Sequence, residues 1–484
     1  MNTAVIGAGW AGLAAALQLL RQGHQVTVFE ASHILGGRAR RSPAPALGMS
    51  IDNGQHILLG AYRETLALMR SMDLDVDALF HRRPLTLLYA DGSFALSAAK
   101  LPAPLHMLAG MLRARGITGH EKLGLVRIMA ALRLRGWRSA PACSVGQWLA
   151  RHHQSERMIR LFWRPLCVAA LNTPIEQACA QLFANVLRDS LGGDAGAADL
   201  LIPLVDLSSL WPDHVQAHAD RLHPGRLSMR LGHAVRRLES LARGVALDGE
   251  RYDALIVACQ APVALRLLRT LDDPPAPSGS SDEGRRHEAR LRYEARLAAL
   301  DHAPIATVTL LLERPWGLPL PMLGLQERPE RLQFGQWLFD AQARLAQADG
   351  GDADSQATRG SNSIRAQGNQ DVRCAASPNS LLHVVISDAH ALERHHAWQV
   401  VGGIIDQVRE QARAYGPMPE VRGHEIIVEK RATFVARPGL PRPANRTPWP
   451  GVMAAGDWTD TGYPAVLEGA VRSGLRAALG LGPA

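Results

Sequence analysis

The chain of 484 residues lacks any uninterrupted apolar run of the about 18 residues that a membrane-spanning helix needs. Its beginning also lacks the positive charges of a secretory signal, and glycines interrupt the apolar stretch there. Aromatic residues make up only 5% and charged residues 20%, but hydrophobic residues make up 47%, which excludes wholesale disorder. We therefore expect a cytoplasmic protein, able to lie on the inner membrane, with about two to four structural units.

Cysteine and lysine are scarce, and both shortages are informative. The five cysteines are far apart and none forms a C-x-x-C pair, so we expect reduced thiols and no metal site. Only three residues are lysines, while arginines are spread along the whole chain and give a net charge of +8. A surface for nucleic acid would need a basic stripe with interleaved aromatic residues, which this distribution does not offer. Nucleic acid is therefore excluded as a partner.

Two short buried-strand runs, at 3–6 and 25–29, flank a stretch of helix formers. Between the first run and the helix stand three glycines in the spacing G-x-G-x-x-G. In this pattern Gly7 permits a tight turn, Gly9 lets a diphosphate approach the backbone, and Gly12 lets the helix pack closely on the strand. The pattern predicts the first turn of a dinucleotide-binding domain.

The residues around this turn support the same interpretation. Trp10 and Ala11 open the helix, where free backbone N–H groups and the helix dipole favour a diphosphate. Glu30 ends the second strand, 18 residues after Gly12, and its carboxylate can accept hydrogen bonds from ribose hydroxyls. We therefore expect an α/β fold with a Rossmann-like domain.

Two further motifs favour FAD over a nicotinamide cofactor. Gly36, Gly37 and Arg38 resemble the G-G-R extension of FAD-dependent amine oxidases and carotenoid desaturases. The second cofactor segment of that family is matched near the C-terminus by Gly456 and Asp457, with a helix following. The resemblance implies that Arg38 reaches the diphosphate and Asp457 binds hydroxyls of the ribityl chain or next to the diphosphate. It also implies that the helix directs its N-terminus at the flavin.

The resemblance extends to the domain organisation. It implies a FAD-binding domain of the glutathione-reductase/amine-oxidase type with an interleaved α+β substrate domain. The FAD-binding domain is expected from 1–75, 215–270 and 425–484, and the substrate domain from 76–214 and 296–424. Residues 272–287 and 348–380 are poor in apolar side chains and are expected to be flexible insertions. Residues 62–136 are expected to be mainly helical.

A weaker match concerns Val235. Residues 225–238 resemble the strand whose backbone contacts the adenine of FAD. A plain structural strand is almost as good an interpretation, so this cofactor contact rests on the resemblance alone.

Three longer segments, 51–62, 161–174 and 455–474, are similar to the hydroxysqualene dehydroxylase family, also called squalene-associated FAD-dependent desaturases. The likeness covers nearly the whole chain apart from the two insertions. It implies FAD-dependent reductive dehydroxylation of hydroxysqualene to squalene in hopanoid synthesis, with an unidentified electron donor. A carotenoid (phytoene-type) desaturase or another FAD-dependent oxidase is an open alternative. A prenyl-binding escort protein without flavin is an alternative that is not an enzyme.

Few residues are candidates for an acid that would assist loss of the hydroxyl. The resemblance implies that His56 and Asp52 lie on a loop near the flavin, where His56 could protonate the leaving hydroxyl and Asp52 could orient the loop. A loop histidine bonded to the backbone is an equal alternative for His56. Other candidates near the substrate are Asp194, Asp199, Asp206, Trp163 and Trp458, with core packing the favoured role of both tryptophans.

A substrate of this size would partition into lipid, so its enzyme has to collect it from a membrane. Residues 101–115 combine an apolar body with arginines at its end, a pattern that can lie in the membrane interface. A helix packed within the substrate domain fits the same pattern somewhat better.

Overall fold

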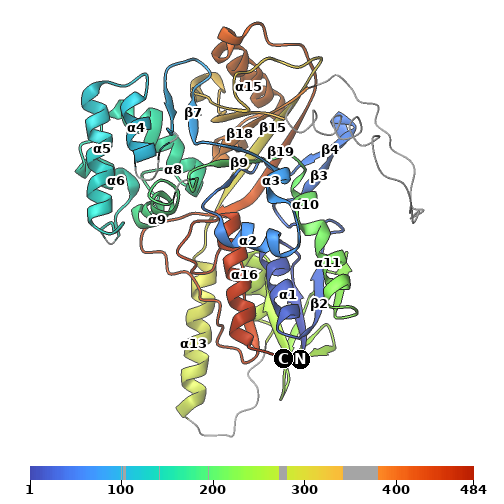
Figure 1. Ribbon diagram of the computed structural model, residues 1–484. Coiled ribbons are helices and arrows are strands. Elements are labelled where there is room, and N and C mark those ends of the chain that lie inside the picture. Colours follow the sequence, from blue (N-terminus) through green and yellow to red (C-terminus); the bar gives the residue numbers. More distant parts are fainter. Residues whose placement is uncertain (100, 102–104, 141, 195, 272–280, 342–379) are drawn as a thin grey trace.

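A computed structural model of the chain describes residues 1–484 except 100, 102–104, 141, 195, 272–280 and 342–379 (Figure 1). A five-stranded parallel sheet lies in its lower half in that view. The strand order is β10 (Leu227–Leu231), β2 (Gln25–Glu30), β1 (Asn2–Ile6), β14 (Ala254–Val257) and β20 (Val452–Ala454). Strands from the two ends and the middle of the chain thus form one sheet. The predicted α/β fold with a dinucleotide-binding sheet is confirmed.

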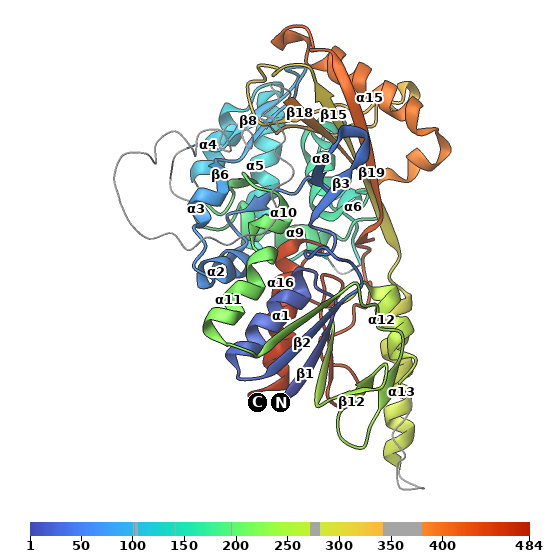
Figure 2. The ribbon, with the colours of Figure 1, turned by 90° about the vertical axis from the view of Figure 1, so that its right-hand side faces the viewer.

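Both faces of this sheet are covered, which explains why its strands read as continuous apolar runs. One face packs against α1 (Trp10–Arg21), α11 (Val215–Leu222) and α16 (Leu467–Leu481). The other face carries α12 (Ala261–Leu268), α13 (Ser281–Ala298) and an antiparallel sheet of β11 (Leu238–Ser240), β12 (Val245–Leu247) and β13 (Glu250–Tyr252) (Figure 2). α1 ends in a Schellman motif, because Gly23 adopts φ +89° and the His24 N–H donates to Leu19 O.

The upper half is built around a second, antiparallel sheet. Its order is β16 (Met322–Gly324), β17 (Trp337–Asp340), β18 (Ser380–Ser387), β15 (His302–Leu312) and β19 (Val421–Phe434). α15 (Ala397–Gln411) packs on this sheet through an apolar face that includes Val400, Ile404 and Val408.

Helices and short strands complete the upper half. The helices are α2 (Arg63–Ser71), α3 (Val76–Leu79), α4 (Leu105–Arg113), α5 (Gly119–Leu134), α6 (Val145–Arg151), α7 (Glu156–Met158), α8 (Arg164–Leu171), α9 (Ala180–Ser190) and α10 (Leu207–Leu210). The strands are β3 (Arg41–Ala44), β4 (Met49–Asp52), β5 (Leu58–Leu59), β6 (Phe80–Arg83), β7 (Thr86–Leu88), β8 (Ala95–Ser97) and β9 (Leu200–Pro203). None of the helices in the described ranges is long and apolar enough to cross a membrane.

The structure corrects several local expectations. Residues 62–136 are mainly helical, through α2, α3, α4 and α5, but the unexpected strands β6, β7 and β8 also lie among these helices. The supposed insertion 272–287 overlaps α13 from residue 281, and Ser380 belongs to β18. The rest of both supposed insertions, 272–280 and 348–379, lies outside the described residues. Residues 425–434 lie in the second sheet rather than with the cofactor strands, since β19 pairs with β15.

Candidate functional site

The turn between β1 and α1 depends on its glycines in two different ways. A Cβ on Gly7, which has φ +106°, would stand 2.8 Å from Ala258 O, and a Cβ on Gly12 would stand 1.8 Å from Gly7 O. A Cβ on Gly9 would meet only the Cα of Gly37, at 3.7 Å. Gly7 and Gly12 are therefore needed for packing, whereas the missing side chain of Gly9 leaves space. The first turn of α1 carries no acidic residue and no side-chain cap, so its positive dipole end is available to an anion.

Glu30 lies against this turn at the end of β2. Its Oε2 accepts a hydrogen bond from the Ala8 N–H (2.7 Å), and its Oε1 accepts one from the Ser32 N–H (2.8 Å). A carboxylate has about four acceptor positions, so Glu30 can fix the turn and still bind ribose hydroxyls. A β-bridge joins Gly36 to Gly9, which brings the second glycine motif onto the first.

Arg38 connects segments that are far apart in the sequence. Its Nη2 donates to Asp457 Oδ1 at 2.7 Å, across 419 residues, and its Nη1 donates to Ala432 O at 2.5 Å. Arg38 and Asp457 line a cleft together with His302 and Trp458. Burial, and next the charge of Arg38, lower the pKa of His302, so this histidine is neutral at pH 7. The G-G-R and Gly-Asp motifs thus meet in space.

The residues at this junction fit FAD. The open space at Gly9, the uncapped helix α1, and the cation of Arg38 suit a diphosphate. The carboxylates of Glu30 and Asp457 suit the hydroxyls at the two ends of the cofactor.

Arg442, which the sequence analysis did not single out, holds the loop that carries Asp457. Its buried guanidinium donates to the carbonyl oxygens of residues 457, 458, 459 and 463 and to Thr461 Oγ1. It also lies over the ring of Phe434, 4.5 Å from the centroid. No carboxylate of the described residues forms an ion pair with it. Burial lowers the pKa of Arg442 to about 10, so the loop is shaped around a buried cation.

Tyr463 ends the loop that Arg442 holds. Its hydroxyl donates to Asp189 of α9, and the guanidinium of Arg472 lies 4.6 Å from its ring centroid. Burial, and next the hydrogen bond to Asp189, raise the pKa of Tyr463 to about 12. The loop is therefore tied to the helical part of the molecule through a neutral phenol.

α16 starts after this loop, so a helix follows the Gly-Asp motif as predicted. Its first turn contains Glu468, a buried carboxylate that accepts hydrogen bonds from Thr65 N–H (3.0 Å) and Thr65 Oγ1 (2.8 Å) and pairs with Arg472 (2.8 Å). Glu468 therefore caps α2 and places a negative charge, balanced by Arg472, at the end of α16 that was expected to face the flavin. That expected role of the helix stays a prediction.

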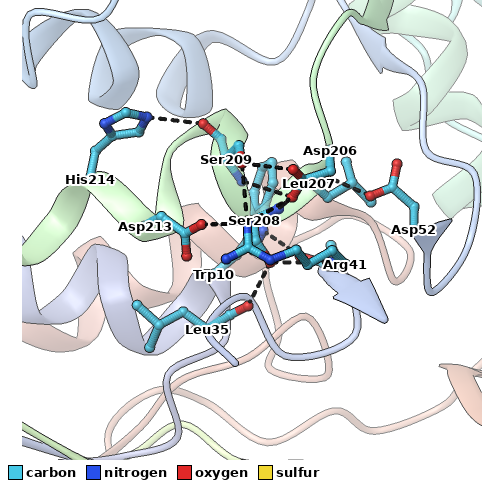
Figure 3. Close-up of polar contacts among 11 residues, drawn as sticks. Trp10, Leu35, Arg41, Asp52, Asp206, Leu207, Ser208, Ser209, Asp213 and His214 are labelled. Atoms are coloured by element: carbon cyan, nitrogen blue, oxygen red, sulfur yellow. Dashed lines mark hydrogen bonds and ion pairs between the residues drawn. The ribbon is translucent and has the colours of Figure 1, made fainter. Parts of the chain in front are cut away.

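Asp52 is buried in a polar network beside α10 (Figure 3). Its Oδ1 accepts the Leu207 N–H at 2.8 Å. In the same network Asp206 caps α10, and Arg41 donates to Asp213 (2.8 Å) and contacts Asp206 (3.5 Å). These contacts support the orienting role proposed for Asp52, because its carboxylate fixes the start of α10 against β4.

His56 is half-buried and its Nδ1 donates to Gly54 O at 2.8 Å. A Cβ on Gly54 would lie 3.6 Å from His56 Cε1 and 4.0 Å from Thr307 Oγ1, so the loop packs beside β15. The bond to Gly54 O requires a proton on Nδ1. Both sequence interpretations of His56 are compatible with this geometry.

The remaining candidates have structural partners. The Trp10 ring packs edge-on against Trp211 (5.2 Å), so only its backbone is suited to a cofactor contact. Trp163 is fully buried among aromatic rings, and Trp458 Nε1 donates to Cys259 O at 3.0 Å, as core packing predicts. Val235 is buried in the connection after β10, not on the expected strand.

Asp194 and Asp199, which were also candidates for a place near the substrate, each form an ion pair with an arginine. Asp194 pairs with Arg63 at 2.7 Å and Asp199 pairs with Arg82 at 2.8 Å. The first pair is largely exposed, which suits a surface role, whereas the Asp199 side chain is only 23% exposed.

A cavity of about 410 Å³ adjoins the cleft of Arg38 and Asp457, and His302 lines both. Its other walls include Asn172, Asp388 and Val435. Asn172, which follows α8, is buried and connects that helix to the second sheet, because its amide donates to Thr433 Oγ1 of β19 (2.9 Å) and its Oδ1 accepts the Asp388 N–H after β18 (2.7 Å). The cavity therefore lies where the second sheet meets the cofactor motifs.

Comparisons with known proteins agree with this arrangement. The sequence pattern of the family described as flavin containing amine oxidoreductase matches residues 10–338 and 431–480. A protein of Rhodopseudomonas palustris named hydroxysqualene dehydroxylase is 28% identical, over 98% of this chain and 96% of its own. A probable zeta-carotene desaturase of Synechococcus elongatus is 24% identical, over 99% of this chain and 98% of its own. A solved oxidoreductase of Methanosarcina mazei shares the fold, with a TM-score of 0.68 at 15% identity over 99% of this chain and 100% of its own.

Proposed function

Because this chain belongs to the flavin containing amine oxidoreductase family and is an FAD-dependent oxidoreductase, we propose that it removes the hydroxyl of hydroxysqualene reductively to give squalene. The observation that carries the proposal is the end-to-end similarity to proteins named hydroxysqualene dehydroxylase in three bacteria. A prenyl-binding escort protein is excluded, because such a protein would hold no flavin whereas this family contains one.

The proposal assigns the cofactor to the motifs that meet in the structure. FAD would be held by the Gly7–Gly9–Gly12 turn, Glu30, and the pair of Arg38 and Asp457. The FAD-binding domain would comprise 1–75, 215–270 and 435–484, with the last segment starting after β19.

The reaction needs an acid, a hydride and a dry site. When bound, reduced FAD would supply the hydride, and a separate electron donor would supply its two electrons. His56 would protonate the allylic hydroxyl, so that the C–O bond breaks with its electron pair on oxygen and water leaves. Asp52 would hold the His56 loop against α10. The hydride would go to the carbon that loses oxygen or to its allylic partner, and the surrounding protein has to keep water from recapturing the cation.

A carotene desaturase is the second candidate, favoured by the similarity to zeta-carotene desaturases. Product analysis with hydroxysqualene and with a carotene precursor, under reducing and oxidising conditions, separates the two. We expect squalene from the chemically reduced enzyme, and in deuterated water a single turnover should place deuterium on the carbinol carbon or its allylic partner. Desaturation of the carotene by the oxidised enzyme, with hydroxysqualene untouched, would replace the proposal by the alternative.

The role of His56 has its own test. His56→Gln keeps a donor that can reach Gly54 O but removes the acid, so turnover should fall about a hundredfold while FAD stays bound. Asp52→Asn keeps an oxygen acceptor for the Leu207 N–H and should stay active, whereas Asp52→Ala should not. Wild-type turnover in His56→Gln would end the assignment of this histidine as the acid.

A further inference from the structure

One helix in the upper half has two apolar faces. α4 packs His106, Met107, Gly110 and Met111 against the protein, and a Cβ on Gly110 would stand 2.6 Å from Ser97 O. Its opposite face presents three leucines to solvent. Leu105, Leu108 and Leu112 are 52%, 37% and 55% exposed, at the spacing that lines up side chains on one side of a helix. An exposed apolar stripe on a packed helix needs an explanation.

The stripe is part of a larger apolar cluster. Leu101, Leu123 and Leu134 are also exposed, and Leu123 and Leu134 lie on α5, which packs beside α4. Thus six of the thirteen large hydrophobic side chains exposed in the described residues fall within 101–134. Figure 1 shows α4 and α5 at the outer side of the upper half, away from the parallel sheet.

A wider stretch around this cluster holds the net positive charge of the protein. Residues 92–155 contain nine Lys and Arg residues but one acidic residue, so the whole formal excess of +8 falls within them. The single acid, Glu121, is engaged in the capping box of α5 and accepts a hydrogen bond from Ser155 Oγ at 2.9 Å. Apart from Glu121, the charged residues between 105 and 134 are all cations, including Arg113, Lys122 and Arg127.

We propose that the leucine face of α4, with Leu123 of α5, docks on the surface of an anionic lipid bilayer. The exposed apolar leucines insert into the boundary between head groups and acyl chains. The neighbouring arginines and lysine contact the lipid phosphates. The proposal rests on the proposed function in one respect, since a squalene-like substrate has to be taken from a membrane. The docking face is defined independently by exposure and charge.

Vesicle sedimentation tests the docking face with the full-length holoenzyme. Wild type should sediment with phosphatidylcholine vesicles containing phosphatidylglycerol, less with phosphatidylcholine alone, and less again in high salt. The triple variant Leu105→Gln, Leu108→Gln, Leu112→Gln should bind at least about tenfold more weakly, because it removes only exposed apolar groups. Arg113→Gln with Arg127→Gln should lose the preference for anionic vesicles.

A matched control separates the docking face from exposed leucines in general. Leu222→Gln with Leu479→Gln changes side chains that are 51% and 59% exposed in the lower half, and should bind vesicles as wild type does. Unchanged melting temperature and flavin absorbance show that each variant folds. Equal vesicle binding by wild type and the triple variant would overturn the proposal, as would a wild-type dimer that ignores vesicles and dissociates in the triple variant.

Turnover measurements test the proposed substrate and the proposed docking face separately. With hydroxysqualene, the triple variant should keep turnover in detergent micelles and lose it when the substrate is in vesicles. Vesicle binding by wild type without any turnover of hydroxysqualene would support the docking face and overturn the proposed substrate. Loss of turnover by the triple variant in both media would contradict a docking role.

Discussion

Gly9 and Gly12 belong to one motif, but they act by different means. Gly9 has φ −74°, which any residue adopts, and an added Cβ would make ordinary contact with Gly37. We expect Gly9→Ala to leave the melting temperature of the apoprotein unchanged and to weaken FAD binding at least about tenfold, because the methyl group would occupy the diphosphate space. Gly12→Ala drives a Cβ into Gly7 O and should destabilise the apoprotein by about 1–3 kcal/mol or more. Thermal melts and flavin titrations measure both, and equal effects of the two variants on melting would contradict the distinction.

Arg442 has five backbone or hydroxyl acceptors on one loop, so its removal should weaken FAD binding. Arg442→Met leaves buried carbonyl groups without a donor, at about 1–3 kcal/mol, and frees the loop that positions Asp457. We expect a large loss of FAD affinity with partial recovery in Arg442→Lys. Arg437→Met is the control, since Arg437 pairs with Asp301 on the surface. FAD affinity equal to wild type in Arg442→Met would show that the loop keeps its shape without the cation.

At the scale of an element, the packing of α4 makes the stability of the folded protein depend on pH. His106 is 5% exposed, neither of its ring nitrogens has a hydrogen-bond partner among the described residues, and burial lowers its pKa below the usual 6.5. As pH falls below 6.5 the unfolded chain takes up a proton that the folded chain resists, so stability is full above pH 6.5 and declines below it. His106→Leu should reduce the fall in melting temperature between pH 7.5 and 5.5. An identical fall in wild type and variant would mean that His106 does not titrate in this way.

The elements that sequence reasoning predicted are those with a strong local pattern. The strand–helix–strand unit with Gly7 and Glu30 is such a case, because both the periodicity and the turn chemistry are local. β6, β7 and β8 were missed because strands of three or four residues carry too few alternations. The start of α13 was missed because an exposed helix held by pairs such as Arg292 with Glu288 resembles a polar insertion in composition.

The site shows the same division. The glycines, Glu30, Arg38 and Asp457 were recognisable because each belongs to a short motif with one chemical purpose. Arg442 stands between prolines, where an arginine resembles any surface cation, and its five acceptors are set by a loop that begins fifteen residues later. Such a contact depends on tertiary structure and leaves no local pattern.

For the whole molecule, FAD should act as a link between distant segments. Glu30, Arg38 and Asp457 come from opposite ends of the chain, and Arg38 also contacts the end of β19. We expect the apoprotein to melt at a lower temperature, and FAD at about a hundred times its dissociation constant to add about 2.7 kcal/mol of stability. NAD should add none. Differential scanning calorimetry with and without each nucleotide measures this, and equal stabilisation by NAD would contradict a flavin-specific site.

The strand order also determines how late this protein can finish folding while it is being synthesised. β1 and β2 emerge first, but their sheet is completed by β14 and β20, and α1 is covered by α16, the last helix of the chain. Ten of the twelve residues of α1 are buried in the finished protein. During translation the face of α1 that packs against α16 therefore stays uncovered until residues 467–481 have been made, and parallel pairing over such separations is slow. We therefore expect the nascent chain to need protection from aggregation until that face is covered.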